Sequence, residues 1–232
     1  LINKTPKMME TLYTAAHACY SDRMPDDIFE NGPIITEKEQ IDAMKASNNP
    51  SEYQMYLNDL KKSKMLKTVR GCIARNHNTV MRHVYFTFSI SEVSRVTMAQ
   101  ITRHHAGIDF DVQSQRYVTM DEKFKWALPD VFYSDLDESV ASRISAFLQE
   151  SKDLYQHLVQ NKIMHKEDAR YLLPNAAPTN MTCTANLAAF MHLYRLRAKD
   201  ATGKAQDEIK ELTKLMAEEV AKSEPWIAEF LK

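Results

Sequence analysis

"HVYFTFSIS", residues 83–91, has the strongest β-strand pattern in the chain. Its aromatic and β-branched residues alternate with others, and Val84, Phe86 and Phe88 fall on one side of that alternation. A period of two predicts a strand with one buried face. Because a single strand cannot complete its own hydrogen-bond ladder, other extended segments must pair with it. The candidate partners are residues 112–119 and 176–183.

Most of the remaining chain has helical periodicity. Thr36 stands three places before Glu39, as in a capping box, and opens a helix predicted over 36–47. The other predicted helices span 53–69, 91–104, 136–161, 184–199 and 204–222, with a short one at "KEDARYLL" (166–173). The pattern therefore predicts a largely helical chain built around a small sheet.

Composition limits the possible functions. At 232 residues the chain is long enough to bury a sizeable core. Its 30 Lys and Arg residues nearly balance its 31 Asp and Glu residues, so no overall field attracts nucleic acid or an anionic membrane. Any phosphate binding must be local. Because the apolar runs are too short for a membrane helix and the first residues lack a signal-peptide pattern, we expect a soluble, cytoplasmic protein.

Cysteine and glycine usage excludes several common sites. Cys19, Cys72 and Cys183 are far apart and form no CxxC pair, so we expect reduced packing residues and neither a disulfide framework nor a metal site. The four glycines form neither a GxGxxG fingerprint nor a P-loop. A nucleotide site in this chain must therefore hold phosphate with side chains.

Charged and hydrogen-bonding side chains concentrate in "ITRHHAGIDFDVQSQRY", residues 101–117. Arg103 and Arg116 carry planar guanidinium groups that suit phosphate oxygens, and Ser114 and Gln115 add further donors. A solvated turn after a helix is the alternative. The glycine-containing turn and the lack of apolar alternation in Gln-Ser-Gln-Arg-Tyr favour a phosphate site.

Blocks along almost the whole chain resemble the flavin-dependent thymidylate synthases, in the right order. "RHHAGIDFDVQSQRY" (103–117) resembles the family's Arg-His-Arg motif with its later Ser-x-Arg-Tyr, and "CYS" (19–21) its early Cys-Tyr-Ser. "HNTVMRHVYFTF" (77–88) resembles its His-x-Ser/Thr segment before a strand. "EDARYLLP" (167–174) and "TANLAAFMHLYRLRAKDATGKAQDEI" (184–209) resemble its Ala-Arg-x-x-Leu-Pro helix and its last helix pair.

The resemblance implies methylation of dUMP to dTMP, with a methylene group from methylenetetrahydrofolate and a hydride from reduced FAD, which NADPH regenerates. Because the flavin carries the redox chemistry, the protein would supply binding and orientation. We expect one α+β domain over 1–232, a twisted, mostly antiparallel sheet flanked by helices, in a homotetramer with shared active sites. The alternatives are C5 modification of a related deoxypyrimidine nucleotide, such as dCMP or a hydroxymethyl product, and a catalytically silent nucleotide-binding homologue.

The resemblance also assigns site residues. Arg197 and Ser114 match catalytic positions, and a guanidinium beside the uracil would stabilise the charge that develops when C5 becomes nucleophilic. Asn186 and Arg197 would share one face of a single helix. The positions matching dUMP contacts are Gln100, Ser114, Gln115, Arg116, Arg170 and Arg197. The positions matching flavin contacts are His77, Thr79, Arg103, His104, His105, Asn186 and His192.

The chain departs from the family's pattern mainly at flavin positions. Arg82 stands where the family usually has Glu, and His105 and Ala188 stand where it has Arg. Asp109 replaces a Ser that many members carry. Losing a charge-assisted contact to phosphate removes roughly 1.5–3 kcal/mol of binding free energy. The sequence therefore predicts that flavin binding is either weakened or rebuilt, while the dUMP side is better kept.

Overall fold

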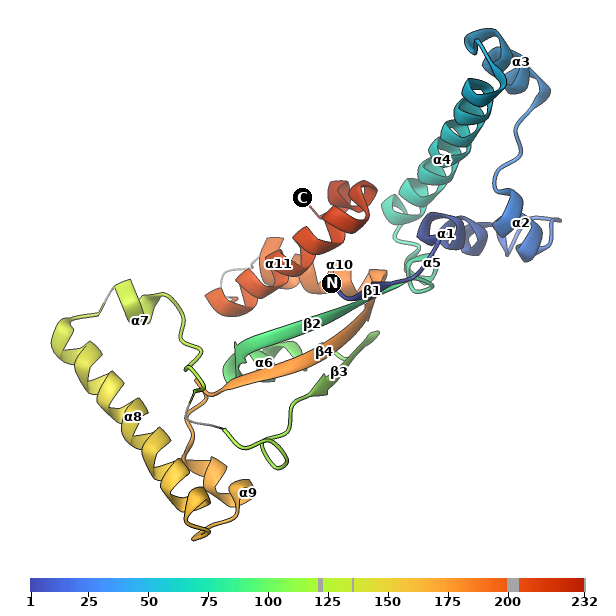
Figure 1. Ribbon diagram of the computed structural model, residues 1–232. Helices are drawn as coiled ribbons and strands as arrows, with labels where there is room; N and C mark the ends of the chain where they lie inside the picture. Colours follow the sequence, from blue (N-terminus) through green and yellow to red (C-terminus); the bar gives the residue numbers. More distant parts are fainter. Residues whose placement is uncertain (121–122, 135, 200–204, 232) are drawn as a thin grey trace.

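The computed structural model describes residues 1–120, 123–134, 136–199 and 205–231. Over these residues, the centre is an antiparallel four-stranded sheet in the order β1-β2-β4-β3 (Figure 1). The strands are β1 (Asn3–Lys4), β2 (Tyr85–Ser94), β3 (Ile108–Val112) and β4 (Pro178–Asn186). Helices pack against this sheet, so the predicted α+β class is confirmed.

Strand β2 is the strand predicted from "HVYFTFSIS". Val84, Phe86, Phe88 and Ile90 are all buried, with at most 4% of their surface exposed. The register against β4 shifts between Ile90 and Val93, where Glu92 has a φ of 59°. This irregularity is a bulge that lets the strand continue to Ser94, beyond the predicted helix start at 91.

Two other predicted boundaries were wrong. The segment 112–119 is not a strand, because β3 ends at Val112 and the Ser114 carbonyl then accepts the N–H groups of Tyr117 and Val118 in a turn. β4 runs through Asn186, so the helix predicted over 184–199 begins only at Leu187. Pairing of β4 with both neighbours favours the extended backbone here, and sequence periodicity does not report such tertiary pairing.

The predicted helices are present with shifted ends, and the Thr36–Glu39 capping box is confirmed. The α-helices are α1 (Met8–His17), α2 (Pro25–Asn31), α3 (Glu37–Ala46), α4 (Pro50–Ala74), α5 (Asn78–Met81), α6 (Arg95–Ile101), α7 (Val131–Ser134), α8 (Glu138–Gln160), α9 (Lys166–Ala169), α10 (Leu187–Tyr194) and α11 (Asp207–Ser223). Short 3-10 helices form η1 (Arg170–Leu172) and η3 (Pro225–Phe230), and η2 (Arg195–Lys199) is π-helical.

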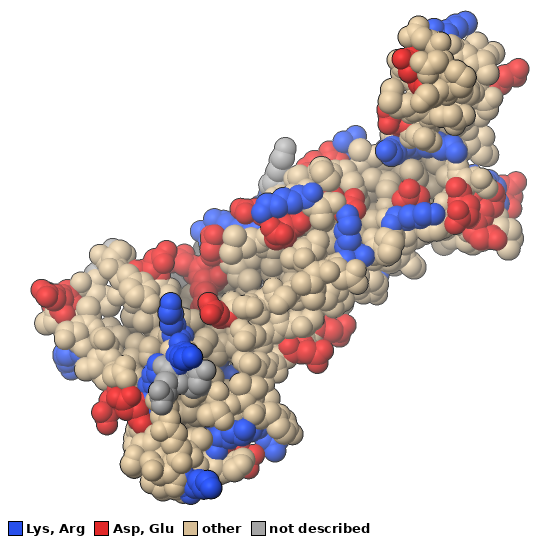
Figure 2. Space-filling view, in the orientation of Figure 1, with Lys and Arg blue, Asp and Glu red and all other residues tan. Residues whose placement is uncertain are grey.

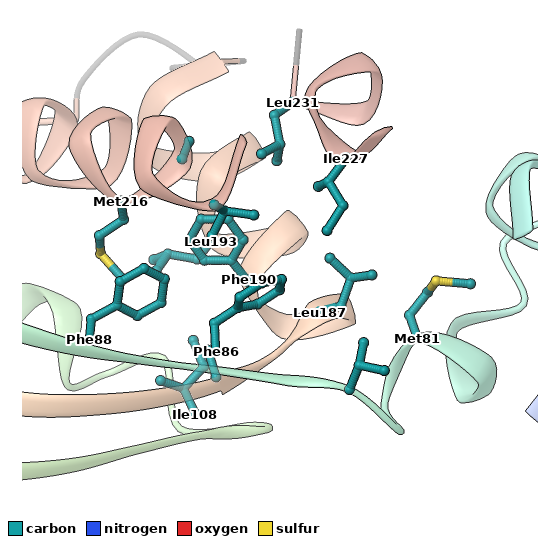
Figure 3. Close-up of a cluster of buried hydrophobic side chains, with 14 of the residues drawn as sticks. Met81, Phe86, Phe88, Ile108, Leu187, Phe190, Leu193, Met216, Ile227 and Leu231 are labelled. Atoms are coloured by element: carbon teal, nitrogen blue, oxygen red, sulfur yellow. The ribbon is translucent and has the colours of Figure 1, made fainter. Parts of the chain in front are cut away.

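The main core lies between the sheet and the helices α10 and α11, which cover one of its faces (Figure 1). The close-up shows Phe86 and Phe88 of β2 beside Phe190 of α10, and the rings of Phe88 and Phe190 stack with centroids 5.7 Å apart (Figure 3). Met216 of α11 closes the cluster above Phe88. These contacts fix α10 on the sheet and thereby position the residues at its two ends.

Two helical arms extend from opposite ends of the sheet, α3–α4 at one end and α7–α8 at the other (Figure 1). Both carry exposed apolar side chains, including Met44 and Met55 on the first arm and Tyr133 and Phe147 on the second. Positive and negative side chains are interspersed over the face seen in Figure 2, consistent with the balanced composition. Within the described ranges, no helix is both long and apolar enough to span a membrane.

All three cysteines are free thiols. Cys72 and Cys183 are buried as predicted, whereas Cys19 is exposed. Burial raises the pKa of the Cys183 thiol to about 12, so this side chain stays protonated and packs as an apolar group. The described residues contain no group of three or more His, Cys, Asp or Glu side chains that could hold a metal ion.

Candidate active site

Asn186 joins strand β4 to helix α10. Its Oδ1 accepts the N–H of Ala189 at 2.9 Å and so caps the first turn of α10. Arg197, in contrast, lies beyond α10 in the π-helical turn η2. The prediction that Asn186 and Arg197 share a face of one α-helix was wrong, because Asn186 itself is extended and the helix changes its winding before Arg197.

Gly107 brings the turn of the Arg-His-His motif against Asn186. The backbone N–H of Asn186 donates to the Gly107 carbonyl at 3.0 Å. Gly107 has a φ of 82°, and a Cβ at this position would lie 2.3 Å from Asn186 Nδ2. Only glycine allows this close approach without displacement of Asn186.

The side chains of His104 and Arg197 are in contact, although the resemblance assigns His104 to the flavin and Arg197 to dUMP. The Nε of Arg197 donates to His104 Nε2 at 3.0 Å. Burial, followed by the charges of Arg197, His192 and Arg103, holds the pKa of His104 below its usual value. His104 is therefore neutral at pH 7 and can accept this bond, while Arg197 makes no other hydrogen bond with the described residues.

A cavity of about 520 Å³ lies beside Asn186; we call it the α5–α10 cavity. Its lining residues are Asn78, Arg82, Ala106, Gly107, Asn186, Ala188, Ala189 and His192. A smaller cavity of about 200 Å³ shares Asn78, Ala188 and His192 and continues toward Arg195 and Lys199. We use the name Asn186 cluster for five residues at this end of the sheet: His104, Gly107, Asn186, His192 and Arg197.

The remaining flavin-matched residues are exposed and lie next to the residues of this cluster in the chain. His77 and Thr79 flank the cavity residue Asn78 at the start of α5. Arg103 and His105 flank His104 in the turn after α6, where the Arg103 carbonyl lies 3.1 Å from His105 Nδ1. Neither is among the residues that line the α5–α10 cavity.

A second group of predicted residues gathers around Glu167. Arg116 Nε lies 3.1 Å from a Glu167 carboxylate oxygen, and Arg170 Nε donates to the Glu167 carbonyl at 2.9 Å. The Ser114 hydroxyl accepts the Arg116 N–H at 3.2 Å. Gln115 is only 6% exposed, and its buried Nε2 has no hydrogen-bond partner within the described chain.

Arg95, the first residue of α6, belongs to this second group but was missed by sequence reasoning. Its backbone N–H donates to the Ala177 carbonyl at 3.2 Å, and its buried Nη1 has no partner among the described residues. Burial first, and then the nearby charge of Arg170, lower its pKa. A cation in the first turn of a helix opposes the helix dipole, but the predicted helix start at 91 placed Arg95 inside the helix, so the sequence carried no such signal. Arg95, Ser114, Gln115, Arg116 and Arg170 form what we call the Arg170 cluster.

Gln100 belongs to neither cluster. Its side-chain amide donates to Gln206 Oε1, just before α11. Two residues further, Glu208 accepts the backbone N–H of Ser94 at 2.7 Å and also binds the Ser94 hydroxyl. The N-terminal end of α11 therefore holds α6 at both of its ends.

The two clusters lie at opposite ends of β4. Asn186 contacts Gly107 at the C-terminal end of the strand, whereas Arg95 contacts Ala177 immediately before its first residue. Nine residues of β-strand span about 26 Å. One chain therefore brings His104 to Arg197, but it does not bring Arg197 to the Arg170 cluster.

Comparison with known proteins defines the class of this enzyme. Residues 1–226 match the family described as thymidylate synthase complementing protein (Thy1). A flavin-dependent thymidylate synthase of Pyrococcus furiosus is 30% identical over 225 residues, which cover 96% of this chain and 78% of that protein. That of Clostridium tetani is 30% identical over 202 residues, with 82% and 79% covered. The chain belongs to the flavin-dependent thymidylate synthase family.

A solved structure confirms the fold. The UMP/dUMP methylase PolB from Streptomyces cacaoi, bound with 5-Br dUMP, superposes with a TM-score of 0.69 at 18% identity. The alignment covers 99% of this chain and 92% of the methylase chain. At this level of identity the likeness establishes the common architecture.

Family membership implies a flavin cofactor, and the α5–α10 cavity suits one. Its described lining contains Arg82, His192 and two asparagines but no Asp or Glu. Such a lining can donate hydrogen bonds to an anionic, diphosphate-bearing molecule without like-charge repulsion. The backbone at Gly107 adds a surface that no Cβ obstructs.

Proposed function

We propose that this enzyme methylates dUMP to dTMP, with methylenetetrahydrofolate as carbon donor, reduced FAD as hydride donor and NADPH as the reductant of the flavin. The contact between Arg197 and His104 carries the proposal, because it joins a dUMP-matched residue to a flavin-matched residue at 3.0 Å. Methyl transfer of this kind requires the pyrimidine and the flavin to lie next to each other.

The Asn186 cluster would hold the flavin and the base. The proposed FAD contacts are His77, Thr79, Arg103, His104, His105, Asn186 and His192. FAD supplies hydride-transfer chemistry when bound. Neutral His104 accepts from Arg197 Nε and thereby fixes the plane of the guanidinium, whose terminal nitrogens can then donate to the uracil edge. A cation placed there stabilises the negative charge on the uracil as C5 becomes nucleophilic.

The Arg170 cluster would hold the phosphate of dUMP. It combines the predicted ligands Ser114, Gln115, Arg116 and Arg170 with Arg95. The buried unpaired nitrogens of Gln115 and Arg95 support this role, because a buried donor without a partner is costly until a ligand accepts from it. The Glu167 carboxylate forms an ion pair with Arg116, so the substrate phosphate would compete with this carboxylate for the guanidinium.

An active site shared between subunits would unite the two clusters. A nucleoside monophosphate is much shorter than the roughly 26 Å that β4 places between them. Arg197 of one protomer would therefore act with the Arg170 cluster of another, and the exposed apolar side chains of the two arms are suitable contact surfaces between copies. We propose a homotetramer, which sedimentation or light scattering tests. A monomer that turns over dUMP contradicts the shared site.

Two measurements test the reaction itself. The purified protein should show flavin absorbance, and with methylenetetrahydrofolate and NADPH it should convert dUMP to dTMP. Release of the C5 hydrogen from dUMP and from dCMP should be followed in parallel. Release from dCMP alone would identify the related deoxypyrimidine nucleotide as substrate. Binding of nucleotide without release from either would identify a catalytically silent homologue.

A further inference from the structure

Arg82 and Ala188 lie on different elements but line the same cavity. Arg82 is the residue that ends α5, and Ala188 lies in the first turn of α10. The resemblance described above implies Glu and Arg at these two positions, which the structure places in the lining of one cavity. A carboxylate and a guanidinium in one cavity can neutralise each other, whereas Arg82 is the one Arg or Lys in the described lining of this cavity.

The Arg82 guanidinium is not engaged within the described part of the chain. It is exposed and forms no hydrogen bond or ion pair with any described residue. No Asp or Glu is found in the described lining of either the α5–α10 cavity or the smaller cavity beside it. A structural role at the end of a helix is weak, because α5 has only four residues and so a small dipole.

We propose that Arg82 is the cofactor-binding cation of the α5–α10 cavity and replaces, from α5, the guanidinium that the resemblance implies at position 188 on α10. The inference rests on the proposed function, because it takes the ligand to be the diphosphate of the flavin cofactor. An arginine matches phosphate oxygens with two parallel donors, so the contact also orients the cofactor. The departures at 82 and 188 are then one compensated exchange rather than two independent losses.

A charge-exchange experiment tests this assignment by titrating FAD and following the quenching of flavin fluorescence. Arg82→Glu should weaken FAD binding about tenfold or more, the effect of losing one charge-assisted contact. Ala188→Arg alone should lower the melting temperature, because it adds a second cation to the cavity. The double variant Arg82→Glu/Ala188→Arg places one carboxylate and one guanidinium in the cavity and should bind FAD within about threefold of the wild type.

Matched controls separate local from general effects. Arg75→Glu makes the same charge change just before α5, outside both cavity linings, and should leave FAD affinity unchanged. Arg82→Gln removes the charge without reversing it. It therefore tests the role of Arg82 in FAD binding if Arg82→Glu impairs folding. The affinity for dUMP, measured separately, should not respond to any of these changes.

The outcomes distinguish this role from the reaction. If Arg82→Glu and Arg82→Gln bind FAD as Arg75→Glu does, Arg82 is not the cofactor cation, whatever the enzyme produces. If the wild type binds FAD and Arg82→Glu weakens it, the assignment holds even when no dTMP forms, and only the proposed reaction fails. A wild type that binds no FAD overturns both.

Discussion

The two ends of β4 differ in how complete they are. At the C-terminal end, Asn186 caps α10, Gly107 lies against Asn186, and His104 accepts a hydrogen bond from Arg197. At the N-terminal end, Arg95 and Gln115 keep buried nitrogens without a partner in the described chain. The first end is preorganised by the chain itself, whereas the second has donors that the described chain leaves unmet and that the dUMP phosphate would satisfy under the proposed function. Preorganisation and unmet hydrogen bonding are therefore separate signs of a site.

The largest effect should follow from removing the planar donor of the preorganised end. Arg197→Lys keeps the charge but loses the fork and the Nε contact to His104. We expect kcat for dTMP formation to fall about 100- to 1000-fold, as when a preorganised donor is removed from other active sites. Urea unfolding and FAD affinity should change little. Near-normal turnover would show that Arg197 does not act on the base.

Gly107→Ala should disrupt the same end through the backbone. The new Cβ meets Asn186 Nδ2 at 2.3 Å, and the φ of 82° strains any side chain. We expect the free energy of unfolding to fall by about 2–4 kcal/mol in urea titrations. Gly71→Ala, at a helical glycine without positive φ, is the matched control. Equal stability of the two variants would contradict the close approach.

Arg95→Met should affect binding and stability in opposite directions at the unfilled end. Removing a half-buried cation near Arg170 relieves desolvation and repulsion, so the free energy of unfolding should stay the same or rise. The affinity for dUMP should fall about 10- to 100-fold, measured by calorimetry. A variant that loses stability while keeping its affinity would make Arg95 a structural residue.

The smallest effect concerns pH. The pKa of His104 is lowered in the folded state, so between the usual value of about 6.5 and this lower value the unfolded chain binds more protons. The stability that the neutral form contributes is complete above this window and is lost as the pH falls through it. The wild type should therefore lose stability relative to His104→Gln as the pH is lowered from 7.5 to about 5. Parallel curves would exclude this titration.

Local patterns predicted the parts of the molecule that local chemistry determines. Alternation identified β2, and the Thr36–Glu39 spacing identified the start of α3. The end of β4 and the position of β3 were predicted wrongly, because pairing with neighbours decides them. Helices α1 and α2, in the first part of the chain, were not predicted at all.

The candidate site shows the same division. The resemblance supplied residue identities, and the structure places the side chains of His104 and Arg197 in contact. The resemblance could not supply the distance along β4 between the two clusters, because matched sequence positions carry no coordinates. It also could not show that Arg82 and Ala188 share a cavity, since they are more than one hundred positions apart and lie on different helices. Arg95 emerged only from its burial and its missing partner.

The bulge at Glu92 changes the phase of β2. Before it, the even-numbered residues Phe86, Phe88 and Ile90 face the core; after it, Val93 is buried instead, and Ser94 with it. The Asn180 side chain stabilises this change by accepting the Glu92 N–H and donating to Gln113 Oε1, 3.3 Å away. One inserted residue thus resets the inward and outward order just before α6 begins. Val93 thus continues the buried face of the sheet after the bulge, and Arg95 begins α6 directly after the strand in this new register.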